Sequence, residues 1–287
     1  MKANSRTIGV LGTGTMGTGI VQLAAQSGYA VVACDTSPES LEHAENYVKR
    51  GLARFVEKGL ISDEQAAYER IDWTTDPAEM SGAEAAVEAI VEKVEPKKEA
   101  LAALDKLLQP EALLLTNTSS ISITDLASAT GRPDRVCGTH FFTPPPLRDA
   151  VEVPRGLLTS DETVERVKAL VTSFGKQPVV VRKDVPGFVA NRFLMPMLIE
   201  ACRLLEEGVA SKEEIDLLVK KGIGFPTGPF ELGDVIGLDV GLDVISYVHD
   251  ELGEPYYAPP RILKELVRAG KLGRKTGAGF YEYPEGS

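Results

Sequence analysis

Short apolar runs alternate with stretches of helical spacing through residues 1–185. Helical spacing is clearest over 96–108, 123–130 and 161–174. Strands that alternate with helices in this way predict a mostly parallel sheet covered on both faces, a doubly wound α/β domain. The runs that we interpret as strands are TIGVLG, YAVVACD, AEAAVEAI, ALLLTNTSS, RVCGTHFF, AVEVP and QPVVVRKD.

Residues 38–70 are charged but carry apolar side chains at helical spacing. This pattern predicts either one long amphipathic helix or a helical hairpin. After VPGFVANR the pattern changes, and nearly every segment has a helical period. We place a domain boundary near 184–187, where a Pro-Gly pair ends the last strand. The expected domains are therefore 1–185, α/β, and 186–287, all helical.

The composition is that of a globular protein with a sizeable core, and its 287 residues carry a net charge of −11. This acidity argues against a surface for nucleic acid or for an anionic membrane. No apolar run reaches the roughly 18–20 residues that a membrane span requires, and we expect a cytoplasmic protein. Cys34, Cys137 and Cys202 lie far apart without CxxC spacing, which predicts reduced, buried thiols and no metal site.

The segment GVLGTGTMG follows a predicted strand and opens a predicted helix. Its glycines, Gly12, Gly14 and Gly17, fit the pattern in which a tight turn, a close approach to a pyrophosphate and close helix–strand packing each require glycine. Asp35 closes the second strand, where a carboxylate accepts hydrogen bonds from a ribose and repels a 2′-phosphate. The pattern therefore favours NAD over NADP. The alternative is a glycine turn in a doubly wound fold that binds no nucleotide.

A stiff loop, THFFTPPPLRDAVEV, carries a histidine at its start and a glutamate twelve residues later. Consecutive prolines remove backbone donors, so this segment is neither a regular helix nor a central strand. We expect the loop to hold His140 for acid–base chemistry with Glu152 as its partner. The alternative is a core histidine bonded to backbone carbonyls.

With these motifs in order, the chain resembles the short-chain L-3-hydroxyacyl-CoA dehydrogenase family. The resemblance also covers EAIVEKVEPKKE, TNTSSISIT, DVPGFVANR, GFPTGPFELGDVIGLD and AGKLGRKTGAGFYEY. It implies a Rossmann-type domain followed by a helical domain for substrate binding and homodimer formation. It also implies NAD-dependent interconversion of 3-hydroxyacyl and 3-oxoacyl thioesters, with His140 as the general base and Glu152 orienting it.

The same resemblance assigns further residues to the reaction. Ser119 and Asn191 are similar to the residues that bond the substrate oxygen, although a helix cap and a turn are structural alternatives. Cofactor contacts are implied for Thr15, Met16 and Asn117, which join the three glycines and Asp35.

Charged residues are assigned in the same way. Glu92 and Lys97 match positions beside the nicotinamide ribose, although the Lys97-Lys98 pair also fits a solvated helix face. The segment 38–70 resembles the part of the family that helps to hold coenzyme A, and Arg54 and Lys58, four residues apart on it, are expected to meet the nucleotide phosphates, although an exposed helix carries such charges anyway.

The chain departs from the family pattern at several positions of the histidine loop and nearby. Thr143 replaces an asparagine that helps to place the substrate, and Lys93 also stands where asparagine is common. Related enzymes have methionine, lysine and leucine where this chain has Arg148, Asp149 and Ala150. The cationic Arg148 would favour an anionic group on the substrate, and the smaller Ala150 side chain would widen the pocket. Arg148 pointing to solvent, or pairing with Asp149, is the alternative. The substrate is therefore a short 3-hydroxyacyl-CoA, a dicarboxylic or substituted one, a carrier-bound acyl group or a free hydroxy acid.

Two other classes of function are alternatives to a dehydrogenase that uses a histidine base. A non-catalytic NAD-binding protein has no evident need for a positioned base, which argues against that class. A hydroxy acid dehydrogenase with a lysine base would use Lys275 in GRKTGAGFY, but this would leave the histidine loop without a role.

Overall fold

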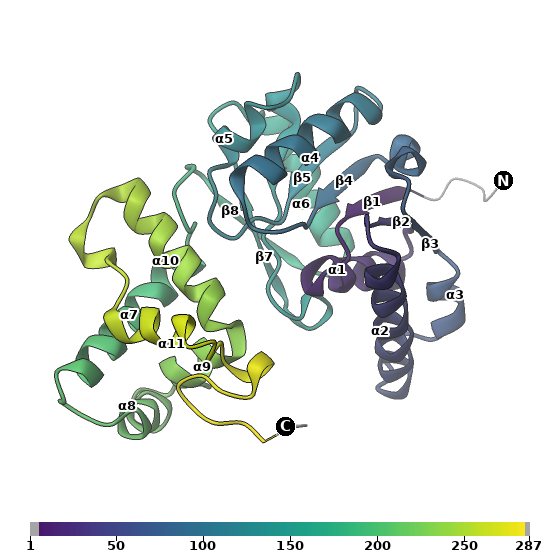
Figure 1. The fold of residues 1–287 in the computed structure, drawn as a ribbon. Helices are drawn as coiled ribbons and strands as arrows, with labels where there is room; N and C mark the ends of the chain where they lie inside the picture. Colours follow the sequence, from purple (N-terminus) through teal and green to yellow (C-terminus); the bar gives the residue numbers. More distant parts are fainter. Residues whose placement is uncertain (1–5, 285–287) are drawn as a thin grey trace. The chain divides into compact units, whose positions relative to one another are not determined.

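The computed structural model describes residues 6–284, and the chain divides into two compact units. Unit 1 is Met1–Asp184 and unit 2 is Val185–Ser287. Unit 1 contains all the named strands, and unit 2 is built from helices (Figure 1). Within the described residues, no helix combines the length and apolar character needed to cross a membrane.

A six-stranded parallel sheet forms the centre of unit 1. Its strand order is β3-β2-β1-β4-β5-β6. Strands β1 to β3 are therefore added toward one edge of the sheet and β4 to β6 toward the other, so the order reverses between β1 and β4. Such a reversal point is where ligands bind in open α/β sheets. The strands are β1 Thr7–Leu11, β2 Ala30–Cys34, β3 Ile71–Thr74, β4 Ala85–Glu88, β5 Leu113–Thr116 and β6 Val136–Gly138. β3 was not among the runs interpreted as strands.

Helices cover both faces of this sheet, as the predicted fold class requires. Side chains of α1, α2 and α6 pack in one core with β1, β2 and β7, whereas α4 and α5 contact each other and β4 to β6 (Figure 1). This core is mostly aliphatic, and Ile8, Val10, Ile20 and Leu23 have no exposed surface. The helices are α1 Thr15–Gln26, α2 Pro38–Glu57, α3 Glu64–Tyr68, α4 Val94–Leu107, α5 Ile123–Ala127 and α6 Asp161–Ser173.

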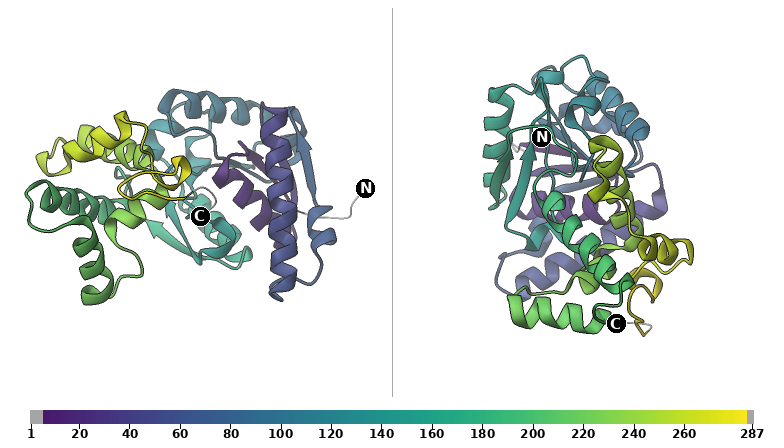
Figure 2. Two further views of the ribbon diagram at one scale, coloured as in Figure 1. Left: turned by 60° about the horizontal axis from the view of Figure 1, so that its bottom comes forward. Right: turned by 90° about the vertical axis from the view of Figure 1, so that its left-hand side faces the viewer.

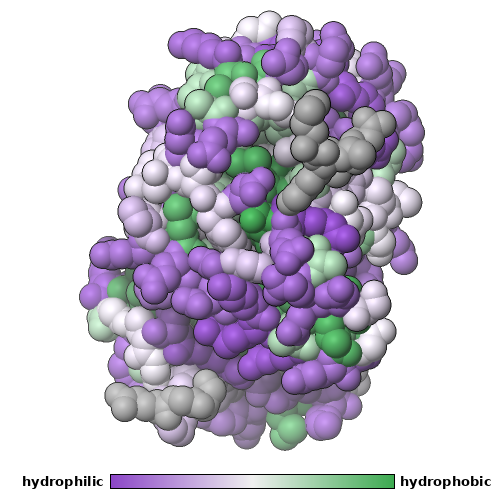
Figure 3. Space-filling view, turned by 90° about the vertical axis from the view of Figure 1, so that its right-hand side faces the viewer, coloured by the Kyte–Doolittle hydropathy of each residue, from purple (hydrophilic) through white to green (hydrophobic). Residues whose placement is uncertain are grey.

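Residues 38–70 form a helical hairpin, the second of the two predicted possibilities. Ser37 caps α2 by accepting a hydrogen bond from the backbone N–H of Ser40, and Pro38 occupies the first turn. α2 packs against α1 and continues past it (Figure 2). The face of the molecule shown in Figure 3 is mostly hydrophilic, with apolar side chains in small separate patches.

β7 Ala150–Pro154 and β8 Gln177–Val181 form a second, two-stranded parallel sheet. The sequence pattern had predicted a mostly parallel sheet and did not separate these two strands from it. The physical reason is the proline loop: β6 ends at Gly138, and the chain returns so that His140 pairs with Glu152 in an isolated antiparallel bridge. This turn separates the second sheet from the first.

Unit 2 packs its helices around one apolar core that includes Leu198, Ile199, Phe230 and Ile245. A buried carboxylate, Asp234, accepts hydrogen bonds from the N–H groups of Phe280 and Tyr281 and from the Tyr283 hydroxyl. The C-terminal segment is thereby fixed to α9. The helices are α7 Ala190–Glu206, α8 Lys212–Leu218, α9 Pro229–Ile236, α10 Leu238–Leu252 and α11 Arg261–Arg268.

All three cysteines are free and buried, as predicted. Burial raises the pKa of the Cys34 thiol to about 11, and it raises those of Cys137 and Cys202 to about 12. At pH 8 the thiolate fraction of Cys34 is therefore only about 0.1%. We expect no cysteine to react with iodoacetamide in the folded protein at pH 8, and all three to react in denaturant. Mass spectrometry of the alkylated protein checks this, and rapid native modification of any cysteine would contradict it.

Candidate active site

The predicted nucleotide and histidine motifs meet at the carboxyl edge of the six-stranded sheet. Strand register aligns Cys34, Leu11, Glu88, Thr116 and Gly138 in one row across five neighbouring strands. The residues that follow this row come from segments far apart in the sequence, and they form the candidate site. They are Asp35, Gly12, Ala89, Asn117 and Thr139-His140.

The three glycines of the turn after β1 differ in what surrounds them. Gly12 has φ +95, and a Cβ there would lie 2.8 Å from the Ala89 carbonyl oxygen. A Cβ on Gly17 would lie 1.8 Å from the Gly12 carbonyl oxygen, so only glycine allows α1 to pack on this turn. A Cβ on Gly14 would meet nothing within 4 Å. Gly14 therefore leaves open space at the start of α1, where a diphosphate can approach the backbone amides.

Asp35 lies beside this turn and fixes it. Its Oδ2 accepts hydrogen bonds from the N–H of Thr13 at 2.7 Å and from the Thr13 hydroxyl at 3.0 Å, while Oδ1 accepts from the N–H of Ser37. The carboxylate is half-buried and remains at the edge of the open space. It can thus accept from a ribose hydroxyl, and its charge disfavours a 2′-phosphate.

This arrangement predicts the cofactor selectivity of Asp35→Asn. We expect the ratio of the NADPH and NADH dissociation constants to fall by about tenfold, because the repulsion of the 2′-phosphate is lost. Asp72→Asn removes an equal charge from an exposed position on β3 and serves as the control. Fluorescence titration with both cofactors measures the ratio. An unchanged ratio in Asp35→Asn would contradict the assignment of Asp35.

The structure brings His140 and Glu152 together. The Nδ1 atom of His140 lies 2.7 Å from Oε2 of Glu152, and the two side chains are buried, with 9% and 5% exposed. A carboxylate only accepts hydrogen bonds, so this contact favours the tautomer of the neutral ring that carries its proton on Nδ1 and leaves Nε2 as the acceptor. The backbones of the two residues also bond to each other in both directions. This geometry fits a base whose ring orientation is fixed by its partner.

Contacts from three other segments hold the histidine loop in place. The Asn117 side-chain carbonyl accepts a hydrogen bond from the N–H of Phe141 at 3.0 Å. Pro145 packs on α1 at Gly19, where a Cβ would lie 2.5 Å from its ring. Buried Lys176 donates to the Pro146 carbonyl oxygen at 2.8 Å, and burial lowers the pKa of Lys176. These contacts join the loop directly to the helix that begins at the glycine turn.

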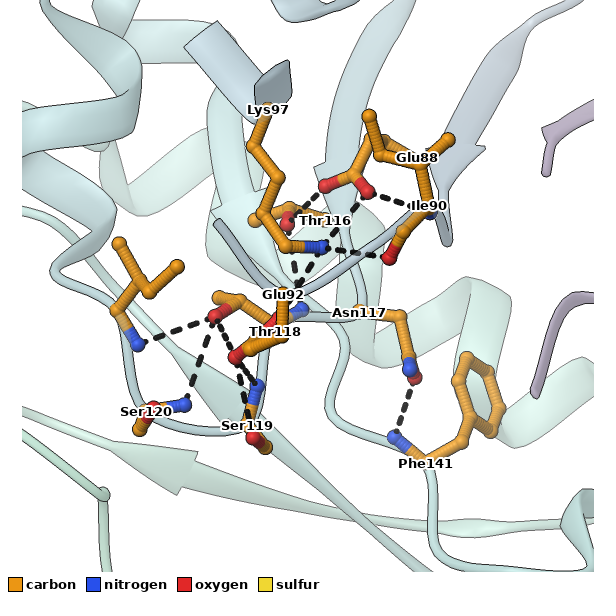
Figure 4. A network of polar contacts seen from close by, with 11 residues as sticks. Glu88, Ile90, Glu92, Lys97, Thr116, Asn117, Thr118, Ser119, Ser120 and Phe141 are labelled. Carbon is orange, nitrogen blue, oxygen red and sulfur yellow. Dashed lines mark hydrogen bonds and ion pairs between the residues drawn. The ribbon is translucent and has the colours of Figure 1, made fainter. Parts of the chain in front are cut away.

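A buried ionic network lies between β4 and β5 (Figure 4). Glu88, with no exposed surface, accepts from Lys97 Nζ, from the Thr116 hydroxyl and from the N–H of Ile90, each at 2.7 Å. Lys97 is 1% exposed and also pairs with Glu92 at 3.2 Å. The solvated-face alternative for Lys97 is therefore wrong, whereas Lys98 pairs with Asp125 at the partly exposed surface.

Glu92 forms the outer end of this network, with its side chain 32% exposed. Oε1 accepts from the Thr118 hydroxyl at 2.6 Å, the N–H of Ser119 at 2.7 Å and the Ser119 hydroxyl at 3.0 Å. Burial alone would raise the pKa of Glu92, but the Lys97 ammonium and these hydrogen bonds outweigh it, so the pKa is lowered. Glu92 is therefore ionised at neutral pH, and it holds the loop that contains Ser119.

The structure also bears on the alternative, purely structural roles of Ser119, Asn191 and Arg148. Ser119 is not a helix cap, because Ser122 caps α5. Asn191 lies in the first turn of α7, not in a turn between elements, and belongs to unit 2. Arg148 is exposed, and its Nε donates to the Thr143 carbonyl oxygen at 2.9 Å. The Thr143 hydroxyl in turn lies 3.0 Å from Met16 Sδ.

The remaining predicted residues lie at the ends of helices α1 and α2. Thr15 and Met16 begin α1 beside the open space at Gly14. Arg54 and Lys58 are exposed at the far end of α2. Their contacts with cofactor or substrate stay predictions.

Two positioning residues were missed from the sequence. Glu88 is an acidic residue in an apolar strand, which was the available signal. Asp184 accepts hydrogen bonds from the Ser122 hydroxyl and the N–H groups of Ile123 and Thr124, and so anchors the segment after Ser119. That contact spans about sixty residues of sequence, and no local pattern reveals it.

Together, the glycine turn at the reversal point and the buried histidine–glutamate pair at the same edge define a dinucleotide-binding domain of the dehydrogenase type. Residues 7–185 match the NAD binding domain of 3-hydroxyacyl-CoA dehydrogenase, and residues 187–283 match its C-terminal domain. The chain belongs to the 3-hydroxyacyl-CoA dehydrogenase family, and its cofactor is NAD.

Individual relatives extend over nearly the whole chain. A probable 3-hydroxybutyryl-CoA dehydrogenase of Deinococcus radiodurans is 45% identical over 96% of this chain and 99% of its own length. The crystal structure of (S)-3-hydroxybutyryl-CoA dehydrogenase from Ralstonia eutropha matches with a TM-score of 0.92 and 42% identity, covering 98% of this chain and 100% of that one. The 3-hydroxyadipyl-CoA dehydrogenase of Escherichia coli is 41% identical over 99% of this chain and 60% of its own length.

Proposed function

We propose that this protein interconverts short-chain 3-hydroxyacyl-CoA and 3-oxoacyl-CoA, with 3-hydroxybutyryl-CoA as its main substrate. The observation that carries this proposal is the buried His140–Glu152 pair, held at the carboxyl edge of the sheet beside the glycine turn. The names of the two 3-hydroxybutyryl-CoA dehydrogenase relatives support the choice of a four-carbon substrate.

The residues divide the chemistry between them. Bound NAD supplies the acceptor for the hydride that leaves C3 of the substrate. His140 takes the hydroxyl proton at Nε2, so that the C3–O bond becomes a carbonyl as the hydride departs. Glu152 keeps the proton on Nδ1 and stabilises the imidazolium that forms. Ser119 and Asn191 are proposed, from the family resemblance, to donate hydrogen bonds to the substrate oxygen.

A dicarboxylic acyl-CoA is the second candidate substrate. Arg148 places an exposed cation on the histidine loop, where it bonds the Thr143 carbonyl. A cation there would favour a distal carboxylate, and the Escherichia coli relative is named for an adipyl substrate. Arg148→Leu separates the two candidates, because it should lower kcat/KM for the dicarboxylic substrate alone.

The test is NADH oxidation with acetoacetyl-CoA, 3-oxoadipyl-CoA and free acetoacetate, compared by kcat/KM. The proposal requires acetoacetyl-CoA to be the best substrate and free acetoacetate to be turned over at least about a hundredfold less efficiently, since the remote part of coenzyme A contributes binding energy to the reaction. A preference for 3-oxoadipyl-CoA would select the second candidate. Turnover of the free acid as the best substrate would contradict both.

We also propose that the protein is a cytoplasmic homodimer assembled through unit 2. Large apolar side chains are exposed on that unit, including Phe193, Leu218 and Ile223 at 65–67%, and a partner subunit would remove such surface from water. The three free, buried thiols fit a reducing compartment. Light scattering after size exclusion tests the dimer, which requires twice the chain mass of 30.9 kDa. Cell fractionation tests the location.

A further inference from the structure

The buried network at the ends of β4 and β5 holds the loop that contains Ser119, and it also carries a net charge. Lys97 lies between two carboxylates, 2.7 Å from Glu88 and 3.2 Å from Glu92. One ammonium against two carboxylates leaves one net negative charge. Glu88, Lys97 and Glu92 are called the ion triad below. Because Glu88 and Lys97 are shielded from solvent, this charge is screened less than a surface charge would be.

The ion triad lies where the nicotinamide half of the cofactor is expected to bind. Glu88 ends β4, the strand next to β1 at the reversal point of the sheet. Ala89, the next residue, forms the wall that a Cβ on Gly12 would strike. On the other side, Asn117 donates its N–H to the Glu88 carbonyl oxygen and accepts from Phe141, the neighbour of His140. The triad therefore lies between the glycine turn and the base.

The two ends of a dinucleotide fall on opposite sides of the reversal point. Asp35 ends the β2 side and marks the adenosine half. The nicotinamide half then lies on the side of β4 and β5, over the triad and near His140. Its ring carries a positive charge when oxidised and none when reduced. A fixed negative charge below it acts on one redox form and not on the other.

We propose that the ion triad sets the preference of the site for oxidised over reduced cofactor, and that Glu88 is the positioning residue that fixes its net charge. This inference rests on the proposed function. Other charges nearby are paired or solvated: Lys98 pairs with Asp125, and Lys93 is exposed. Among the described residues of unit 1, the His140–Glu152 pair is another buried ionisable group near this position, and the variants below leave that pair unchanged.

The test separates charge from shape by three variants. Glu88→Gln keeps the shape but makes the triad neutral. Glu88→Asp keeps the charge but shortens the side chain. Glu99→Gln removes a carboxylate from an exposed position of α4, the helix that carries Lys97, and is the matched control. Dissociation constants for NAD⁺ and NADH are measured by titration calorimetry without substrate, and the melting temperature of each variant is recorded.

The expected result is a rise of about tenfold in the ratio of the NAD⁺ and NADH dissociation constants for Glu88→Gln, the effect of one unit charge acting over roughly 12 Å of protein. The ratio should stay near that of the wild type in Glu88→Asp and Glu99→Gln, even if Glu88→Asp melts earlier. An unchanged ratio in Glu88→Gln, or equal weakening of both cofactor forms, would overturn the proposal.

The experiment remains decisive if Glu88→Gln does not fold or if the proposed substrate is wrong. If Glu88→Gln does not fold, Glu92→Gln makes the same charge change at the partly exposed end of the triad, and the same rise in the ratio is required. Because no substrate is present, the result is independent of which acyl thioester the protein uses. Failure of the proposed substrate would leave the ratio intact, whereas failure to bind either cofactor form would remove the basis of both proposals.

Discussion

Replacing His140 with alanine is expected to lower kcat for acetoacetyl-CoA reduction by about 10²- to 10⁴-fold, the usual contribution of a positioned acid–base group. The physical reason is that the carbonyl oxygen must gain a proton as the hydride arrives, and His140 is the buried imidazole held ready by Glu152. KM for NADH should change little, since the glycine turn and Asp35 are untouched. Stopped-flow absorbance at 340 nm measures the rate.

The control for this prediction is a second histidine with a carboxylate neighbour. His249 lies 3.3 Å from Asp250, but the pair is on the partly exposed surface of α10. His249→Ala should retain wild-type kcat. If His140→Ala were to keep more than about a tenth of the wild-type rate at an unchanged melting temperature, His140 would not be the base.

Replacing Gly17 with alanine is expected to cost about 3 kcal/mol or more in the free energy of unfolding and to abolish tight NADH binding. The added Cβ would lie 1.8 Å from the Gly12 carbonyl oxygen, so α1 must move away from the turn. A backbone oxygen cannot yield as the end of a side chain can. Chemical denaturation and NADH fluorescence titration measure the two losses.

Gly14→Ala provides the matched comparison, because it adds the same methyl group in the same turn. That methyl would meet no protein atom within 4 Å, so stability should stay within about 0.5 kcal/mol of the wild type. NADH affinity should nevertheless fall, since the methyl group fills the space that a diphosphate requires. Unchanged NADH binding in Gly14→Ala would show that the dinucleotide does not pass over Gly14.

Much of the fold could be predicted from local pattern. The alternation of apolar runs with helical segments predicted the parallel sheet, and the continuous helical period after the Pro-Gly pair predicted helices in unit 2. β3 was missed because the exposed Asp72 and the partly buried Trp73 interrupt its apolar pattern. The separate β7–β8 sheet could not be predicted, because it depends on the path of the histidine loop rather than on the composition of the strands.

The candidate site divides in the same way. The glycine turn, Asp35 and the histidine loop are readable because their chemistry requires particular residue types at fixed spacing. The resemblance assigned Glu92 and Lys97 to the site, but neither Glu88 nor the association of the three residues in an ion triad could be predicted from the sequence. Lys97 looks like a surface lysine on an amphipathic helix, and only the fold shows that it is enclosed between Glu88 and Glu92. Contacts such as Asn117 to Phe141 likewise form only after β5 and β6 pair.

In the proposed mechanism, His140 and Glu152 act as one acid–base unit. The most direct test is a double-mutant cycle with His140→Ala, Glu152→Gln and the combined variant, each assayed for kcat with acetoacetyl-CoA. Glu152→Gln alone should be slower than the wild type by about tenfold or more, and the combined variant should be no slower than His140→Ala, since a partner without its base has nothing to orient. Rate losses that multiply in the combined variant would contradict the claim, because the two residues would then act independently.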